Sequence, residues 1–301
     1  MRYPLAILLL AALSAPPAHA GVVTVDAPSQ TVESSRLRMI FDFGRPEFLR
    51  NLFFKDWSPL LDIAGEDGYA YEFWGQSLRD VNSLGYVDNT QLESHTWEVL
   101  QASGPVARIR VQSESTGQPP VTTTYTFVAD QPWFMVERKV HFSQLPDSAA
   151  SQYYSPRVAF LNSYRALRWR DVTGKFVQKG YCYNGCLTPS WDGRWVEHVS
   201  LANQDSLSIA QIYPNTMPPG TILVRGSGPE SLAGWVSPLA PAGLRNGDVT
   251  TRLMVAFSTL ASDTTALDSL WALYNAGGPW MVDVPVTPPT AGARPRLAVS
   301  P

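Results

Sequence analysis

The segment VTTTYTFVADQPWFMVERKVHFS, residues 121–143, predicts two long β-strands joined by a turn at Ala129-Asp130-Gln131-Pro132. The second strand alternates between an apolar set and a mostly polar set, namely Phe134, Val136, Val140 and Phe142 against Met135, Glu137, Lys139 and His141. Successive strand side chains point to opposite faces, so one face is mostly apolar and the other carries an acid, a base and an imidazole. Arg138 interrupts the apolar row. The segment therefore predicts a β-sandwich strand with a polar outer face.

Similar strand-like segments follow one another along most of the chain. They lie at residues 22–26, 37–43, 69–73, 94–102, 107–113, 122–129, 134–143, 154–162, 195–202, 208–213, 221–225 and 249–257. Turns such as Ser103-Gly104-Pro105 separate them. Helical spacing is confined to residues 263–275 and a shorter stretch at 58–63. We therefore predict an all-β fold, a large antiparallel β-sandwich with one or two short helices.

The first 20 residues have the pattern of a secretory signal peptide. Met1-Arg2 gives a basic start, residues 5–13 an apolar run, and Ala18-His19-Ala20 a cleavage site. No Cys follows the run, and no later apolar stretch approaches about 18 residues, so no membrane anchor is expected. The sequence predicts a periplasmic or secreted protein, with one sandwich domain at residues 21–283 and a flexible Pro/Ala-rich tail at 284–301.

Composition and motifs exclude several functional classes. The net charge is −3 and the charges are well mixed, so the basic patch that nucleic acid requires is missing. The sequence has no Gly-x-Ser-x-Gly elbow, phosphate loop, dinucleotide fingerprint or zinc-protease helix, so no cofactor is indicated. The chain holds 10 Trp, 12 Tyr and 12 Phe, enough to fill a sandwich core and leave rings that face sugars.

The two cysteines, Cys182 and Cys186, flank Tyr183, Asn184 and Gly185. In an oxidising compartment this spacing favours a disulfide, with Asn-Gly supplying the turn. A zinc site would need a second pair of ligands, which is missing, so no metal is predicted.

A pattern of residues at the predicted hairpin resembles a known family. Tyr125, Phe127, Pro132, Trp133, Phe134, Val136 and Val140 form Tyr-x-Phe-x-x-x-x-Pro-Trp-Phe-x-Val-x-x-x-Val. This pattern, within a long run of paired strands, resembles the supersandwich of the galactose mutarotase-like superfamily, which many polysaccharide lyases and glycoside hydrolases share. The resemblance implies a concave sheet that faces a saccharide. It transfers no catalytic residue to this chain.

The segment of residues 179–198 carries the leading candidates for catalysis. Around the cysteine pair it collects Lys179, Tyr181, Tyr183, Trp191, Arg194 and His198. Uronate β-elimination needs a cation to neutralise the carboxylate, a base such as Tyr or His, and an acid for the leaving oxygen. Strand alternation would place Arg194, Val196 and His198 on one face, opposite Trp195 and Glu197. The alternative is a surface loop braced by the disulfide, with Tyr and Trp packed beneath it.

Other polar groups have both a functional and a structural interpretation. Residues 71–88 include Trp74 and Arg79, which suit a sugar carboxylate or belong to an ordered loop. Lys139 and His141 contact a ligand or form a solvated strand face. His95 is either buried with a partner or exposed. Glu66 and Asp67 are one candidate for the paired carboxylates that glycoside hydrolysis needs, but they also fit a solvated turn.

The sequence thus predicts an exported carbohydrate-active enzyme, with a polysaccharide lyase acting on a uronate glycan as the leading hypothesis. The predicted catalytic residues are His198, Tyr181 and Tyr183. The predicted substrate-binding residues are Arg79, Trp74, Lys139, His141, Trp191 and Arg194. The alternatives are a non-catalytic glycan-binding or cell-envelope protein, a mutarotase-like sugar epimerase, and a glycoside hydrolase. In each case the expected partner is a poly- or oligosaccharide.

Overall fold

The predicted hairpin forms in the computed structural model of the chain, as β8 (Val121–Val128) and β9 (Trp133–Phe142). The strands pair in antiparallel register from Val121 opposite Val140 to Phe127 opposite Phe134. At the turn Asp130 adopts a φ of 59°, and its carboxylate accepts a hydrogen bond of 2.7 Å from the Ser35 hydroxyl. Asp is among the residues that tolerate this left-handed conformation, so the turn is compatible with its sequence.

The strands of the described residues form two antiparallel sheets. The structure describes residues 21–42, 49–56, 94–114, 120–142, 157–160, 166–180, 186–199, 207–216, 219–226, 232–236, 247–259 and 264–278. The five-stranded sheet has the order β4 (Leu49–Phe54), β3 (Leu37–Phe41), β2 (Thr31–Glu33), β1 (Val23–Asp26) and β6 (Ser103–Gly104). The twelve-stranded sheet has the order β10 (Arg157–Phe160), β16 (Leu232–Val236), β15 (Gly220–Gly226), β13 (Cys186–Val199), β14 (Ser208–Ile212), β17 (Gly247–Ser258), β9, β8, β7 (Val106–Glu114) and β5 (Ser94–Gln101). β11 (Ala166–Asp171) pairs with β13 and with β12 (Phe176–Gly180).

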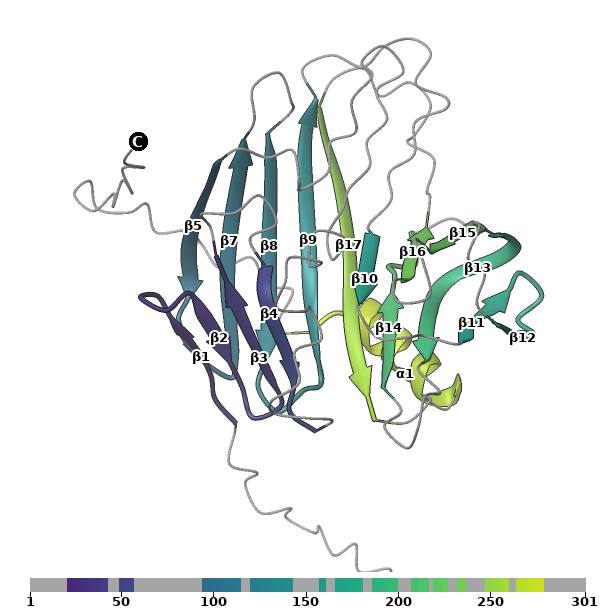
Figure 1. Ribbon diagram of the computed structural model, residues 1–301, viewed down its shortest axis with the longest axis horizontal. Coiled ribbons are helices and arrows are strands. Elements are labelled where there is room, and N and C mark those ends of the chain that lie inside the picture. The colour runs from purple at the N-terminus through teal and green to yellow at the C-terminus, as the bar shows by residue number, and fades with distance from the viewer. Residues whose placement is uncertain are drawn as a thin grey trace, which may run out of the picture.

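The main core lies where the small sheet covers one face of β5, β7, β8, β9 and β17 (Figure 1). Phe41 meets Tyr125 edge-on at 5.4 Å between ring centroids, and Phe54 lies 5.7 Å from Phe257. Phe134 of β9 and Val136 belong to the same core. The alternation read from the hairpin therefore correctly identifies the sandwich face of β9.

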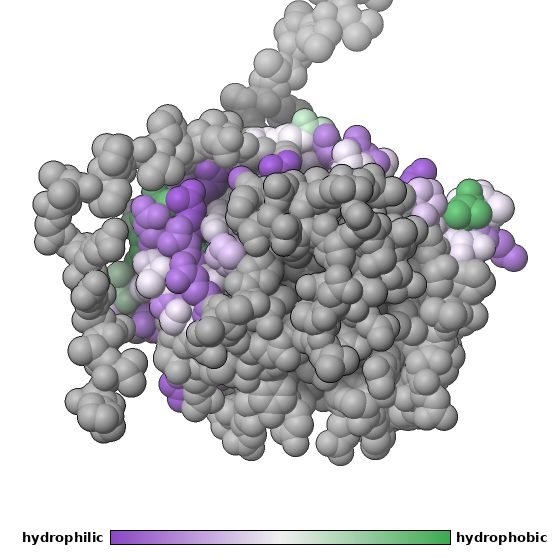
Figure 2. Space-filling model, turned by 90° about the horizontal axis from the view of Figure 1, so that it is seen from above, coloured by the Kyte–Doolittle hydropathy of each residue, from purple (hydrophilic) through white to green (hydrophobic). Residues whose placement is uncertain are grey.

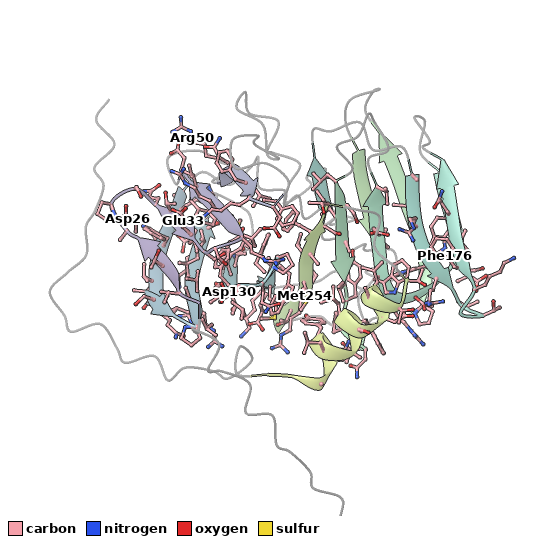
Figure 3. All side chains as sticks on the ribbon, turned by 90° about the horizontal axis from the view of Figure 1, so that it is seen from below. Asp26, Glu33, Arg50, Asp130, Phe176 and Met254 are labelled. Atoms are coloured by element: carbon pink, nitrogen blue, oxygen red, sulfur yellow. The ribbon has the colours of Figure 1, made fainter. Side chains whose placement is uncertain are left out.

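A second core lies on the opposite face of the large sheet, beneath helix α1 (Thr264–Ala276). It includes Trp133 and Met135 of β9, Trp195 of β13, and Leu267 and Tyr274 of the helix. Figure 3 shows α1 on the side of the large sheet away from the small sheet. The turn end of β9 is consequently buried on both faces, whereas its polar residues begin at Glu137.

The predicted helix at residues 263–275 and most predicted strands are confirmed, with shifts of a few residues at their ends. The sequence missed the short strands β2, β6, β11, β12 and β16, the strand β4, and the first half of β13. The strand at 69–73, the helix at 58–63 and the tail at 284–301 lie outside the described residues. Within the described chain no helix has the length and apolar character needed to cross a bilayer.

Candidate functional site

A hollow of about 290 Å³ opens on the α1 face of the large sheet. We call it the α1 hollow, and it is lined by Pro214, Asn215, Thr216, Thr250, Arg252, Tyr274 and Asn275. Three elements form it: the chain after β14, strand β17, and the C-terminal turn of α1. Side chains from three elements therefore line one open concave space, whose volume is close to the lower limit of about 300 Å³ for small-molecule sites.

Three charged side chains lie at this hollow and on the neighbouring strand. Arg252 Nε donates to Glu137 Oε2 at 2.5 Å, and Lys139 Nζ lies 3.7 Å from Glu137 Oε1. The pairing follows from strand register, which sets Glu137 opposite Arg252 and Lys139 opposite Thr250. The Arg252 and Lys139 side chains are 50% and 49% exposed, so both remain accessible to a ligand. Two cations and one anion give the group a net positive charge.

Tyr274 and Asn275 form the helical wall of the hollow and are fixed by packing and hydrogen bonds. Asn275 Oδ1 accepts from the Asn215 backbone N–H at 2.6 Å, and its Nδ2 donates to the Trp271 carbonyl at 2.8 Å. Burial is the main reason why the pKa of Tyr274 is raised above its usual value. The phenol stays protonated at neutral pH, so it suits hydrogen bonding and not proton abstraction.

Two rows of polar residues extend from the hollow across five strands, and we call them the two polar rows. They are Thr250, Lys139, Thr122, Gln112 and Thr96, and beside them Arg252, Glu137, Thr124, Arg110 and Glu98. All ten residues are exposed or half-buried. Figure 2, a view from above, shows hydrophilic surface at the left, over the upper ends of β5, β7 and β8. Four interstrand spacings make the rows about 19 Å long, enough for an extended ligand.

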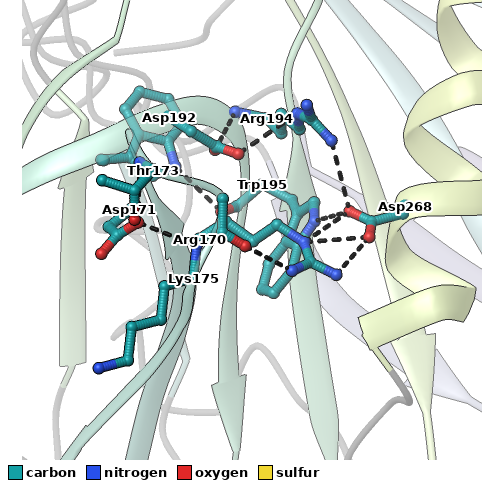
Figure 4. Close-up of polar contacts among 10 residues, drawn as sticks. Arg170, Asp171, Thr173, Lys175, Asp192, Arg194, Trp195 and Asp268 are labelled. Carbon is teal, nitrogen blue, oxygen red and sulfur yellow. Dashed lines mark hydrogen bonds and ion pairs between the residues drawn. The ribbon is translucent and has the colours of Figure 1, made fainter.

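A second polar cluster joins α1 to β11 and β13, and we call it the Asp268 network (Figure 4). Arg170 donates through Nε and Nη2 to the Asp268 carboxylate, at 3.0 and 2.5 Å, and the Trp195 indole N–H donates to it at 3.0 Å. Arg194 Nη1 lies 4.0 Å from Asp268, and its Nε lies 3.3 Å from Asp192. The Arg194 guanidinium lies 4.9 Å from the centre of the Trp271 ring. These contacts fix the helix against the sheet.

The two carboxylates of this network titrate in opposite directions. Burial raises the pKa of Asp192, and contacts with the Arg194 backbone and side chain only partly offset it. Burial also acts to raise the pKa of Asp268, but the hydrogen bonds from Arg170 and Trp195 outweigh it and leave the pKa below its usual value. Asp268 is therefore an anion held by donors, whereas ionised Asp192 is poorly stabilised.

These opposite shifts predict opposite effects of neutralisation on stability. Ionised Asp192 costs stability above its raised folded-state pKa, and the cost vanishes below the unfolded pKa of about 3.9. Ionised Asp268 contributes stability above that unfolded value, which is lost as pH falls through its lowered folded pKa. We expect Asp192→Asn to stabilise and Asp268→Asn to destabilise the protein at neutral pH. In urea unfolding curves the Asp192→Asn difference should vanish as pH falls to about 4, whereas the Asp268→Asn difference should persist there and be lost only at lower pH. A same-sign effect of the two variants at neutral pH would refute this assignment.

The structure corrects two predictions at β13. Ser190 and Gly193 have φ angles of 73° and 88°, and the pairing of β13 shifts between Thr188 and Trp191. Such an irregularity breaks the two-residue alternation of a strand. Arg194 therefore contacts α1 and does not share the face of Val196, which lies in the main core. Trp191 is 1% exposed, meets Tyr213 edge-on at 5.1 Å and donates to the Trp195 carbonyl. A ring so enclosed packs the core and cannot stack on a sugar.

The remaining predicted site residues are distributed as follows. Lys139 lies beside the α1 hollow, and Arg194 lies in the Asp268 network. These two residues stand on β9 and β13, which β17 and β14 separate. His141 lies on β9, and His198 and Cys186 lie on β13. The side chains of these three residues are outside the described set. Trp74, Arg79, Tyr181, Tyr183 and Cys182 lie outside the described residues. His95 is half-buried, and its Nδ1 lies 2.8 Å from the Ser113 hydroxyl.

The sequence missed most of the residues that line the hollow. Thr250 and Arg252 lie in a predicted strand, and their alternation with Thr251 and Leu253 was the available signal for an outward polar pair. Asn215 and Asn275 carry no comparable signal, because 60 residues separate two groups that meet only through the fold.

Comparison with known proteins shows similarity in fold alone. No model of a known protein family matches the chain, and no curated protein matches it. The chain is similar to an alpha-mannosidase from Enterococcus faecalis V583, with a TM-score of 0.57 and 9% identity over 83% of this chain and 31% of that one. It is also similar to an alpha-N-acetylgalactosaminidase from Bifidobacterium bifidum, with a TM-score of 0.51 and 14% identity over 81% and 38%.

A third similar structure is the galactosidase domain of an alpha-galactosidase-sucrose kinase, with a TM-score of 0.50 and 8% identity over 79% of this chain and 42% of that one. The chain thus spans less than half the length of each of these proteins. The described residues share the fold of these structures, an antiparallel β-sandwich.

Proposed function

We propose that this chain is an exported carbohydrate-active protein that binds an oligosaccharide at the α1 hollow and along the two polar rows. The observation that carries the proposal is the composition of the hollow, where guanidinium, amide and hydroxyl groups converge. Sugar hydroxyls both donate and accept hydrogen bonds, so such mixed groups suit them. The fold adds support, since it occurs in three proteins named as sugar-acting enzymes. The signal-peptide pattern supports export.

Glycoside hydrolysis is the reaction class nearest to these structures, because each is named as a glycosidase or galactosidase domain. A uronate lyase is the second candidate. It is favoured by the positive charge of Arg252 and Lys139, since β-elimination requires neutralisation of the substrate carboxylate.

A product assay separates these reactions. The protein is incubated with α-galactosides, α-mannosides and uronate polysaccharides, and both reducing ends and the ultraviolet absorbance of unsaturated uronate are measured. A hydrolase produces reducing ends alone, and a lyase produces both signals. Saturable binding without product indicates a glycan-binding protein. If the folded protein neither binds nor converts any saccharide of the panel, the carbohydrate proposal is wrong.

A further inference from the structure

We propose that the α1 hollow selects an acidic sugar unit, whose carboxylate binds the terminal nitrogens of Arg252. This inference rests on the proposed function and adds the class of ligand. It assigns Arg252 as the residue that determines specificity, with Lys139 as a second cation at the same surface.

The geometry of Arg252 carries the argument. Its hydrogen bond to Glu137 uses Nε. Among the described residues Glu137 is its one ion-pair partner, so the edge formed by Nη1 and Nη2 is available on a side chain that is 50% exposed. Two parallel N–H donors match the two oxygens of a carboxylate and give bidentate recognition. Glu137 meanwhile fixes the orientation of the guanidinium, which lowers the entropy cost of binding.

The charge balance of the hollow also favours an anion. Among the described residues Glu137 is the one acid that contacts Arg252 and Lys139, and it faces two cations. The other lining residues are neutral: Pro214, Asn215, Thr216, Thr250, Tyr274 and Asn275. The hydroxyls of Thr216 and Thr250 are suited to the hydroxyl groups of the same sugar ring. An acidic monosaccharide unit thus matches both the guanidinium of Arg252 and the neutral residues that line the rest of the hollow.

The test compares ligands that differ only in charge. Trimers of galacturonate, glucuronate and mannuronate are titrated by calorimetry, each against its methyl ester. We expect at least one acid trimer to bind about tenfold more tightly than its ester, with a preference that decreases as salt is added. If every ester binds as tightly as its acid, or if no trimer binds, the inference is wrong. Binding of neutral sugars in the product assay would then leave the carbohydrate proposal standing.

Three variants locate the selectivity. Arg252→Gln should reduce the preference for the acid trimer to within about twofold, because the neutral amide keeps hydrogen bonding and loses the charge. Glu137→Gln should act in the opposite direction and strengthen binding of the acid, because it removes a competing carboxylate. Arg36→Gln is the matched control, since Arg36 forms an exposed ion pair of 3.0 Å with Asp56 away from the hollow. An acid preference that survives Arg252→Gln would overturn the assignment.

Discussion

Replacement of Glu197 by glutamine is expected to lower the free energy of unfolding by about 3–5 kcal/mol, the largest loss that we expect for a conservative change among the described residues. The Glu197 side chain is fully buried, accepts a hydrogen bond from the Ser208 hydroxyl, and lies 2.7 Å from Arg168 Nη1. Arg168 is 10% exposed at its side chain, and its guanidinium lies 4.9 Å from the centre of the Phe176 ring. The substitution leaves this cation without a counter-charge in a medium that solvates it poorly.

Urea unfolding measures the effect through the transition midpoint, with the slope checked for a change in the unfolded state. Glu98→Gln is the matched control, because Glu98 pairs with Arg110 at 3.5 Å with 43% of its side chain exposed. An exposed pair contributes at most about 1 kcal/mol. The double variant Arg168→Met, Glu197→Leu should recover most of the loss, since it removes both charges. A loss for Glu197→Gln no greater than that for Glu98→Gln would show that the buried pair is not important for stability.

The second large effect concerns binding: Thr250→Trp should abolish saccharide binding, a loss of at least about 100-fold in affinity. Thr250 is exposed and lines the α1 hollow, so an indole at this position would occupy the volume that the ligand needs. Stability should change by less than about 0.5 kcal/mol, because a substitution on an exposed strand face disturbs no buried contact. Calorimetric titration with the tightest ligand of the panel gives the affinity, and thermal unfolding verifies the fold.

Thr96→Trp provides the matched control for this blocking variant. Thr96 is likewise an exposed threonine of the first polar row, four strands away on β5. It should retain binding of a short saccharide, whose ring occupies the hollow alone. If Thr96→Trp and Thr250→Trp weaken binding of a single monosaccharide unit equally, the ligand does not bind at the α1 hollow.

Sequence alternation predicted the fold because it reports which face of each strand is buried. The β8–β9 hairpin could be read directly, since apolar residues recur at every second position and Asp130 supplies the turn. The sequence did not predict strand β11, because Arg168 and Arg170 occupy buried or half-buried positions, where apolar residues are expected. Their acceptors, Glu197 and Asp268, are distant in the chain, so the compensation is visible only after folding.

The site was less predictable because it depends on register and on the position of a helix. Lys139 was predicted from its place on the polar face of β9, but its neighbour Thr250 lies 111 residues further along the chain. The irregularity at Ser190 and Gly193 reversed the expected face of Arg194. Helix α1 was predicted as an element, yet no local pattern indicates that Tyr274 and Asn275 meet β17 and Asn215.

A crystal structure of the protein soaked with a uronate trimer would show directly where a saccharide binds. We expect electron density for a sugar ring in the α1 hollow, with its carboxylate on the terminal nitrogens of Arg252 and a hydroxyl within hydrogen-bond distance of Thr250. Density for the trimer at another surface, with the hollow empty at saturating ligand, would contradict this expectation.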